Sequence, residues 1–205
     1  MEKFLITQSL LSSWMYMFDC PEGGEEDAKA DFVRTLNREK KEPTDAMLNG
    51  IEFENAVYAA AAGVQRTPHP KWESGIQKVA AIVRGAPVQV RVQRDIEVCG
   101  MTFVAYGILD VLKAGTIYDV KFKNRNFKDV ELAGTYLESP QHPMYFYIVP
   151  EAREFVYLVS DGSDLYTERY TPDTSRPISD IIGEFILSIT SMGLLDTYKE
   201  KWLAK

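Results

Sequence analysis

Apolar and polar residues follow two different periods along this chain. They alternate in strand fashion from Val88 to Val98 and again, after a turn at Cys99-Gly100, through residues 101–122. A second strand pair is expected for residues 154–159 and 165–170, joined by Asp161-Gly162. Helical periodicity occupies six segments, which are residues 7–17, 28–40, 44–62, 70–85, 139–149 and 178–202, the last one broken at Gly193. The pattern predicts an α/β fold in which a central mixed sheet is flanked by helices.

Nothing along the chain marks a boundary between domains. The 205 residues contain no internal repeat, low-complexity tract or linker, and 45% of them are hydrophobic, which is enough for one sizeable core. We therefore expect one domain over residues 1–205. It would consist of N-terminal helices (1–85), a sheet core (86–170) and a C-terminal helical segment (171–205).

Two aspartates, Asp110 and Asp119, interrupt what are otherwise apolar strands, and Lys121 follows the second of them. The neighbours of both aspartates are apolar in both phases of the alternation, which is typical of strands covered on both faces. Burying an unpaired ionised group costs several kcal/mol, so such groups are paired, protonated or bound to a cation. These two carboxylates are therefore candidates for a functional site.

The expected turn fixes how the two aspartates face each other. If Ala114-Gly115 forms a two-residue hairpin, Lys113 pairs with Thr116, and Asp110 then lies opposite Asp119. Two facing carboxylates repel each other unless a positive charge lies between them. A divalent cation supplies that charge, and oxygen ligands without cysteine or histidine favour Mg²⁺ or Mn²⁺. Lys121 lies on the same sheet face as Asp119 and reaches the same site.

Helical periodicity selects a third carboxylate. In the helix predicted after Thr44, Glu54 falls inside the apolar face that contains Phe53 and Val57, whereas Glu52 points to the opposite side. Glu54 is thus directed at the core or at a cleft in it. Glu52 is interpreted as a surface charge.

Charge and cysteine content limit the setting of the protein. The formal net charge of -7 argues against nonspecific adhesion to nucleic acid, so a nucleic-acid site would need a local basic patch. Such a patch is available between residues 113 and 128, although a solvated strand end explains part of it equally well; its members are Lys113, Lys121, Lys123, Arg125 and Lys128. Two cysteines, no signal peptide and no membrane-length apolar window predict a cytoplasmic protein.

The order of these residues resembles a known family. A glutamate on a helix, then Asp110, then Asp119-Val-Lys121 on neighbouring strands, is similar to the PD-(D/E)XK nucleases, in particular their RecB-like and RecE-like branch of phage recombination exonucleases. Gln141-His-Pro-Met-Tyr145 matches the Gln-x-x-x-Tyr motif of the RecB-like branch. The resemblance covers roughly residues 7–150. It departs from the pattern at Phe53, where many RecB-like relatives carry histidine.

The resemblance implies a restriction-endonuclease-like core and a role for each matched residue. Asp110, Asp119 and the carbonyl of Val120 would bind Mg²⁺ or Mn²⁺, and Glu54 would complete the shell directly or through water. Lys121 would position the attacking water and stabilise the developing charge. Gln141 and Tyr145 would support the site or hold the substrate, with Lys123 and Arg125 at its rim.

The leading hypothesis is a metal-dependent deoxyribonuclease, an exonuclease of DNA recombination or repair. A second hypothesis is a nuclease-derived protein that binds nucleic acid or assembles with other proteins without cleaving. A third is that the aspartates hold a structural cation and the protein acts elsewhere. Single-stranded or double-stranded DNA is the expected partner. A homo-oligomer and a recombination partner protein are both left open.

Overall fold

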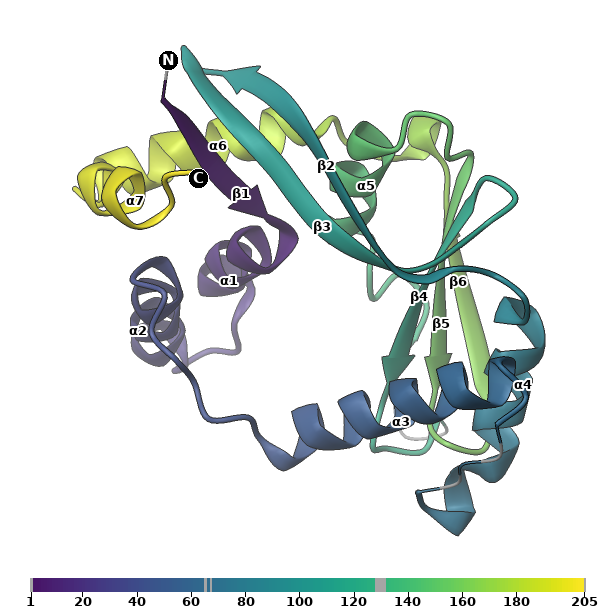
Figure 1. Cartoon of the computed structure of the whole chain (residues 1–205). Coiled ribbons are helices and arrows are strands. Elements are labelled where there is room, and N and C mark those ends of the chain that lie inside the picture. The colour runs from purple at the N-terminus through teal and green to yellow at the C-terminus, as the bar shows by residue number, and fades with distance from the viewer. Residues whose placement is uncertain (1, 65, 67, 128–131, 205) are drawn as a thin grey trace.

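The structure is a computed structural model that describes residues 2–64, 66, 68–127 and 132–204 (Figure 1). Its strands are β1 (Lys3–Thr7), β2 (Val88–Val98), β3 (Met101–Lys113), β4 (Thr116–Phe122), β5 (Glu154–Ser160) and β6 (Leu165–Tyr170). Its α-helices are α1 (Gln8–Asp19), α2 (Glu25–Leu36), α3 (Asp45–Ala61), α4 (Glu73–Val83), α5 (Gln141–Ile148), α6 (Ile178–Ser191) and α7 (Leu195–Lys201). The predicted α/β fold with a mixed central sheet is confirmed, and it is consistent with a restriction-endonuclease-like architecture.

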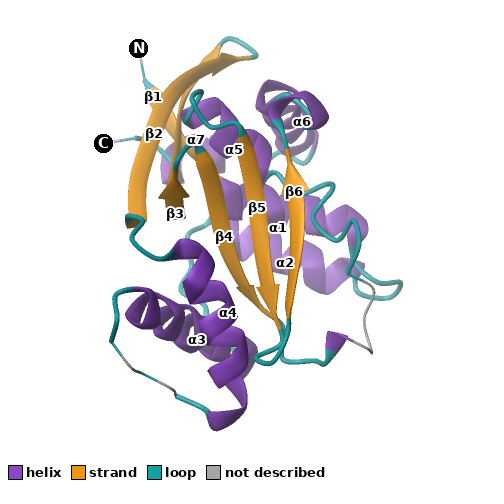
Figure 2. Cartoon of the chain, turned by 90° about the vertical axis from the view of Figure 1, so that its right-hand side faces the viewer, coloured by secondary structure: helices purple, strands orange, loops and turns teal. Residues whose placement is uncertain are grey.

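All six strands of the described chain belong to one sheet, in the order β1-β3-β4-β5-β6, with β2 also paired to β3 (Figure 2). The pairs β1–β3 and β4–β5 are parallel, and the remaining pairs are antiparallel. Helices cover both faces. Helices α3 and α4 lie on one face, and α1, α2, α5, α6 and α7 lie on the other.

The long strand β3 uses its two edges differently. Along one edge it pairs with β2 from Met101 to Val111. The other edge is therefore shared by two short partners: β1 pairs with residues 102–106, and β4 pairs with residues 111–113. Within the described residues, no strand pairs with positions 107–110 on that edge. The sheet is open at the point where β1 ends and β4 has not yet begun.

The two-residue turns predicted at Cys99-Gly100 and Ala114-Gly115 are present. Cys99 and Gly100 have φ angles of 51° and 72°, and Ala114 and Gly115 have φ angles of 51° and 82°. Two consecutive residues with positive φ are the mark of the type I′ turn, which matches the twist of the strands it joins. The predicted pairing of Lys113 with Thr116 is confirmed, and the β3–β4 ladder ends two residues later at Val111↔Tyr118.

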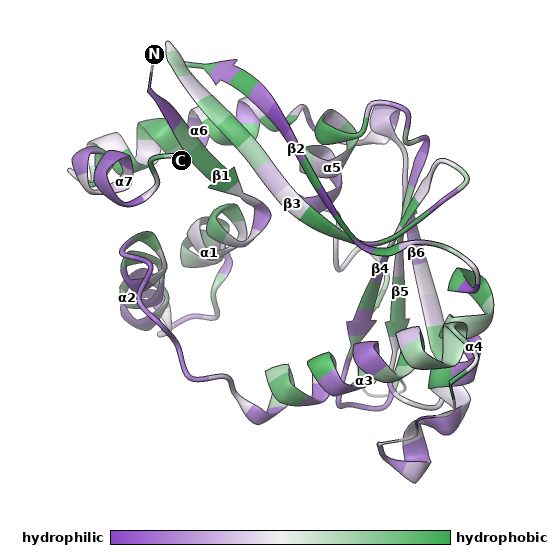
Figure 3. Ribbon diagram, viewed as in Figure 1, coloured by the Kyte–Doolittle hydropathy of each residue, from purple (hydrophilic) through white to green (hydrophobic). Residues whose placement is uncertain are grey.

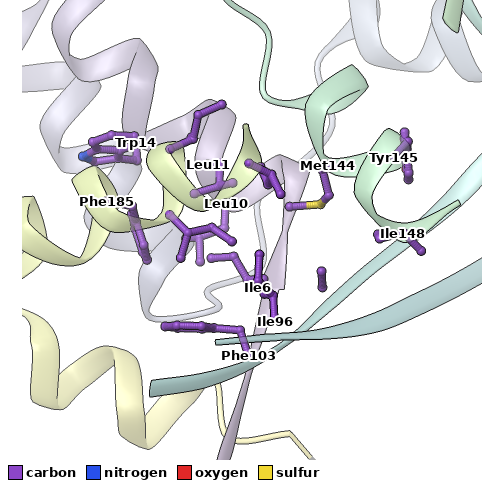
Figure 4. Packing of buried hydrophobic residues seen from close by; sticks show 14 of the residues in the cluster. Ile6, Leu10, Leu11, Trp14, Ile96, Phe103, Met144, Tyr145, Ile148 and Phe185 are labelled. Atoms are coloured by element: carbon purple, nitrogen blue, oxygen red, sulfur yellow. The ribbon is translucent and has the colours of Figure 1, made fainter. Parts of the chain in front are cut away.

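Two apolar clusters hold the layers together. The larger one packs α1, α2, α5, α6 and α7 against the sheet, and in it the rings of Trp14 and Phe185 lie 5.7 Å apart (Figure 4). The smaller one packs α3 and α4 against β4 and β5 through Phe53, Val79 and Val156. Figure 3 shows the apolar residues of β1, β5 and α6, and the polar connection between α2 and α3.

The main element that the pattern did not predict is β1, which precedes α1. Its five residues are too few for a clear period, and their pairing with β3 joins segments about half the chain apart. Thr7 ends the strand and caps α1, because its hydroxyl oxygen accepts a hydrogen bond from the backbone N–H of Leu10. The helix expected at residues 28–40 lies at Glu25–Leu36, and the segment expected at 70–85 begins with a 3₁₀ turn at Pro70–Trp72.

Within the described residues, no single helix is both long and apolar enough to cross a membrane, although α6 with its preceding turn and α7 would meet that requirement as a bent pair.

Gly107 lies where β3 passes beneath α5, and this contact leaves no room for a side chain. A Cβ atom at Gly107 would stand 2.7 Å from the hydroxyl oxygen of Tyr145 and closer still to its ring. We expect Gly107→Ala to lower the free energy of unfolding by about 1–3 kcal/mol. Gly50→Ala is the matched control, because nothing lies within 4 Å of a Cβ at this helical position; it should stabilise by about 0.5–1 kcal/mol. Urea unfolding measures both, and equal effects would contradict the close contact.

His142 predicts a pH dependence of stability. Its ring is buried, stacks on Tyr170 at 4.1 Å and lies 3.2 Å from the hydroxyl of Tyr157. Burial lowers the pKa of His142 from 6.5 to about 4. Between about pH 6.5 and 4, His142 is therefore protonated in the unfolded chain but not in the folded chain. The free energy of unfolding falls as the pH drops through this range, by up to about 3 kcal/mol.

The measurement is the difference in unfolding free energy between pH 7 and pH 5. This difference should be about 2 kcal/mol smaller in His142→Gln than in the wild type. The stability that the variant loses through poorer packing is the same at both pH values, so it does not affect the comparison. His69→Gln removes an exposed imidazole and is the control. An unchanged difference in His142→Gln would show that another group dominates the acid response.

Candidate active site

The opening on the edge of β3 contains the first of the predicted site residues. Backbone groups at positions 107–110 lack a strand partner on this side, and buried backbone groups need some partner. Tyr145 of α5 provides one, because its hydroxyl donates a 2.9 Å hydrogen bond to the carbonyl of Ile108. The side chain of Asp110 satisfies a backbone group on the facing strand, since its Oδ2 accepts a 2.9 Å hydrogen bond from the backbone N–H of Val120. Asp110 thus spans the gap between β3 and β4.

Asp119 is the most deeply buried charged residue of this group, with 3% of its surface exposed. Its Oδ1 accepts a short hydrogen bond from the side-chain amide of Gln141 at the start of α5. The ammonium of Lys121 lies 2.7 Å from the other oxygen, Oδ2. Apart from this ion pair, no described group contacts Oδ2 through a hydrogen bond. Lys121 is therefore the one described partner of this buried oxygen.

Glu54 approaches the same site from α3. Its Oε1 accepts hydrogen bonds from the hydroxyl of Tyr58 at 2.6 Å and from the side-chain amide of Gln89 at 2.9 Å. Gln89 also lies 3.2 Å from the Tyr58 hydroxyl. The predicted orientation of the helix holds: Glu54 is partly buried beside the core, and Glu52 is exposed. Tyr58 and Gln89 complete a network that ties Glu54 to the beginning of β2.

The three carboxylates interact electrically. Burial raises the pKa of Asp110, and the charges of Asp119 and Glu54 raise it further. Burial also raises the pKa of Glu54, with a smaller contribution from Asp119. For Lys121, burial lowers the pKa, but Asp119 and Asp110 outweigh that effect and leave it raised. The site is therefore a cluster of negative charge in which Lys121 is the balancing cation.

The donors fit a hard divalent cation at the Asp110–Asp119 pair. The N–H and C=O of one strand residue point to the same side, so the Val120 carbonyl faces β3 beyond the end of the ladder, as its N–H does. Together with Oδ2 of Asp119, this gives all-oxygen donors, which Mg²⁺ and Mn²⁺ prefer. Within the described part of the chain, however, no three Asp, Glu, His or Cys side chains lie close enough to form a metal cluster.

Of the remaining predicted residues, Gln141 and Tyr145 contact the site directly and the basic residues lie farther along the chain, after Lys121. Gln141 and Tyr145 contact Asp119 and Ile108 directly, whereas Lys123 lies over the ring of Tyr136, 5.9 Å from its centre. Arg125 lines a separate polar cavity beyond the end of β4. Lys128 lies outside the described residues. Sequence reasoning did not identify Tyr58 or Gln89, and the four-residue spacing of Tyr58 from Glu54 was the one signal available.

Comparisons with known proteins support the fold. The sequence matches no family model, and no curated protein matches it. Among solved structures, the exonuclease LHK-Exo in complex with dAMP is similar with a TM-score of 0.54 and 14% identity over 96% of this chain and 92% of that one. The crystal structure of SSO0001 is similar with a TM-score of 0.53 and 13% identity over 94% of this chain and 77% of the other. At this level of identity the likeness concerns the fold.

Gln89 carries a testable backbone constraint. It lies in strand β2 with a φ angle of 54°, between the register pairs Val88↔Val111 and Val90↔Leu109, so that it stands opposite Asp110. For residues other than glycine this conformation costs roughly 1–2 kcal/mol. Gln89→Gly should therefore be more stable than Gln89→Ala by about 1 kcal/mol, the reverse of the usual order inside a strand. Urea unfolding compares the two, and an alanine variant as stable as the glycine variant would contradict the left-handed backbone.

Proposed function

We propose that this protein is a metal-dependent deoxyribonuclease, and specifically an exonuclease of DNA recombination or repair. The observation that carries the proposal is the buried Oδ2 of Asp119, whose one described partner is the ammonium of Lys121, close to the carboxylate of Asp110. A structural cation alone would not need a half-buried lysine beside the carboxylates. The similarity of fold to an exonuclease that binds dAMP supports the same assignment.

Each residue then has a defined task. Asp110, Asp119 and the Val120 carbonyl hold Mg²⁺ or Mn²⁺, and Glu54 joins directly or through a water. The cation, when bound, lowers the pKa of a coordinated water and neutralises charge on the scissile phosphate. Gln141 fixes the orientation of the Asp119 carboxylate through Oδ1, which leaves Oδ2 for the cation. Tyr145 holds the opening of β3 in shape.

Lys121 is the cation that this chain itself brings to the phosphate. In the absence of metal its ammonium lies against Asp119 Oδ2, the oxygen that the metal would take. Metal binding would release the ammonium from that ion pair without removing it from the site. The Lys121 ammonium would then orient the attacking water and stabilise the charge that develops on the phosphate oxygens.

One observation favours a second candidate. The three carboxylates do not form a ready metal cluster, and Lys121 already neutralises Asp119. A protein that kept this arrangement permanently would bind nucleic acid or a protein partner without cleaving. Such a protein would show no thermal stabilisation by Mg²⁺ or Mn²⁺.

The test uses Lys121→Ala with Lys29→Ala as its control, since Lys29 is exposed on α2. End-labelled linear and closed circular DNA, single and double stranded, are incubated with Mg²⁺, Mn²⁺ or chelator. We expect metal-dependent loss of linear DNA only, reduced about 100-fold or more in Lys121→Ala and unchanged in Lys29→Ala. Cleaved circles would make the protein an endonuclease. Full activity in Lys121→Ala would remove the mechanism.

Metal binding has a separate readout that does not depend on cleavage. Mn²⁺ at 100 times its dissociation constant should stabilise the wild type by about 2.7 kcal/mol. Asp119→Asn should lose most of that shift, because the metal loses a charged ligand. If Mn²⁺ gives no thermal shift, the second candidate, in which Lys121 keeps Asp119 neutralised, is favoured instead.

A further inference from the structure

A polar cavity of about 620 Å³ lies beyond the end of β4, apart from the carboxylate cluster. Four segments form its walls, namely α3, the turn before α4, the stretch after β4 and the β5–β6 turn. We call it the amide pocket, and its principal lining residues are Asn49, Glu52, His69, Asn124, Arg125 and Asp161. Its volume is within the range of small-molecule sites, roughly 300–1,000 Å³.

The walls of the amide pocket are tied together. The backbone N–H of Lys123 donates to the Ser160 carbonyl at 2.9 Å, and that of Phe127 donates to the Asp161 carboxylate at 3.2 Å. On the other side, the backbone N–H of Gly75 donates to the Gly162 carbonyl at 2.8 Å. The cavity is therefore a built feature of the fold and does not depend on a single loop.

The position of the pocket relates it to the candidate active site. Asn124 follows Lys121 by three residues, so the two are at most about 11 Å apart along the chain. Asn49 precedes Glu54 by five residues of the same helix, a rise of about 7.5 Å. The two elements that carry Lys121 and Glu54 thus continue directly into the pocket walls.

The charges in the pocket do not suit a phosphate. Lys71 and Arg125 are balanced by Glu52 and Asp161. Burial raises the pKa of Asp161, but hydrogen bonds from the backbone N–H groups of Asp164, Ser163 and Phe127 lower it overall, so its negative charge is held in place. A pocket whose formal charges cancel gives little attraction for an anion and favours a neutral polar group.

The hydrogen-bonding groups suit the edge of a nucleobase. Among the described residues, none hydrogen-bonds the side-chain amides of Asn49 and Asn124, although both line the cavity. A side-chain amide offers a donor and an acceptor together, as the edges of the bases do. The exposed ring of His69 lies 5.4 Å from the ring of Trp72 with an angle of 33° between their planes, and its Nδ1 accepts a hydrogen bond from the Lys71 backbone. These two contacts position the ring, which is exposed at the pocket wall.

We propose that the amide pocket is a nucleobase subsite, which takes one unstacked base of a single-stranded DNA end beside the scissile phosphate; this rests on the proposed function. The base stacks on His69, and the amides of Asn49 and Asn124 bind its edge. The phosphates of the same strand are left to Lys121 and the bound cation. Contacts of this kind recognise bases that are free of a duplex, so the subsite selects single strands or frayed ends.

The test measures binding by fluorescence anisotropy with a short labelled oligothymidylate and with copies that carry one abasic sugar at successive positions. Binding is measured in Mg²⁺ on a background that does not cleave. That background is Lys121→Ala if the wild type degrades DNA, and the wild type if it does not. Failure of the proposed function therefore leaves this experiment intact.

We expect one abasic position to weaken binding about tenfold, as the loss of a stacked base does. On the same background, Asn49→Ala combined with Asn124→Ala should reduce the tenfold difference between the intact and the abasic strand, because the amide contacts to the base are lost while the stacking remains. Asn55→Ala, an exposed position on the same helix, should keep the full tenfold difference. His69→Phe should retain the difference, and His69→Ala should lose it.

Three results would overturn the subsite. The first is that no abasic position weakens binding. The second is that the tenfold difference persists in the double asparagine variant. The third is that this variant weakens the intact and abasic strands equally, which would place its contacts on the backbone. A melting temperature equal to that of Asn55→Ala establishes that the double variant is folded.

Discussion

The lapse in pairing along one edge of β3 is the constraint on which the candidate site depends. Strand β2 holds β3 continuously on the opposite edge, so β3 stays extended while β1 and β4 occupy only the ends of the open edge. Side chains must therefore satisfy the backbone groups at the gap, and Tyr145 and Asp110 do so. A continuous β3–β4 ladder would occupy the N–H of Val120 and leave Asp110 without this bond. The unpaired stretch therefore gives buried carboxylates a place between two strands of the sheet.

The carboxylates at this opening repel one another, and neighbouring site residues offset part of that repulsion. Burial raises the pKa of Asp110 and of Glu54, and the charge of Asp119 raises both pKa values further. Gln141 and Lys121 offset part of this through Asp119. Removing either one would leave a buried charge less compensated, which is more damaging than the loss of a surface ion pair. The same groups that stabilise the metal-free protein would therefore determine how readily it accepts a cation.

How far the sequence predicts this arrangement depends on the range of the interaction. Asp110 and Asp119 stood out because their neighbours are apolar in both phases, and the Ala114-Gly115 turn set their register. The helical period separated Glu54 from Glu52. These are local signals. The structure agrees with the turn and with the orientation of Glu54, whereas the β3–β4 ladder ends at Val111↔Tyr118, one position before the expected Asp110–Asp119 pair.

Long-range features left no such signal. The pairing of β1 with β3, the left-handed backbone at Gln89 and the contact of Gly107 with Tyr145 arise only when distant segments meet. A glutamine in a strand gives no indication of positive φ, since the residues that usually adopt it are glycine, asparagine and aspartate. The amide pocket likewise needs four segments and has no counterpart in any short motif.

An acidic protein that acts on a polyanion has to confine its positive charge. With a net charge of -7, this chain gains little from diffuse attraction to phosphate, and its described basic residues near the site are partly committed. Lys121 pairs with Asp119, Lys123 lies over Tyr136, and Arg125 shares a pocket with two acids. A bound cation would thus supply much of the charge that meets the scissile phosphate. Contacts to the bases would then contribute a larger share of the affinity for DNA, because stacking and amide hydrogen bonds are not opposed by the protein's negative charge. In the proposed function, the neutral pocket would hold the strand and the charged cluster would act on its phosphate.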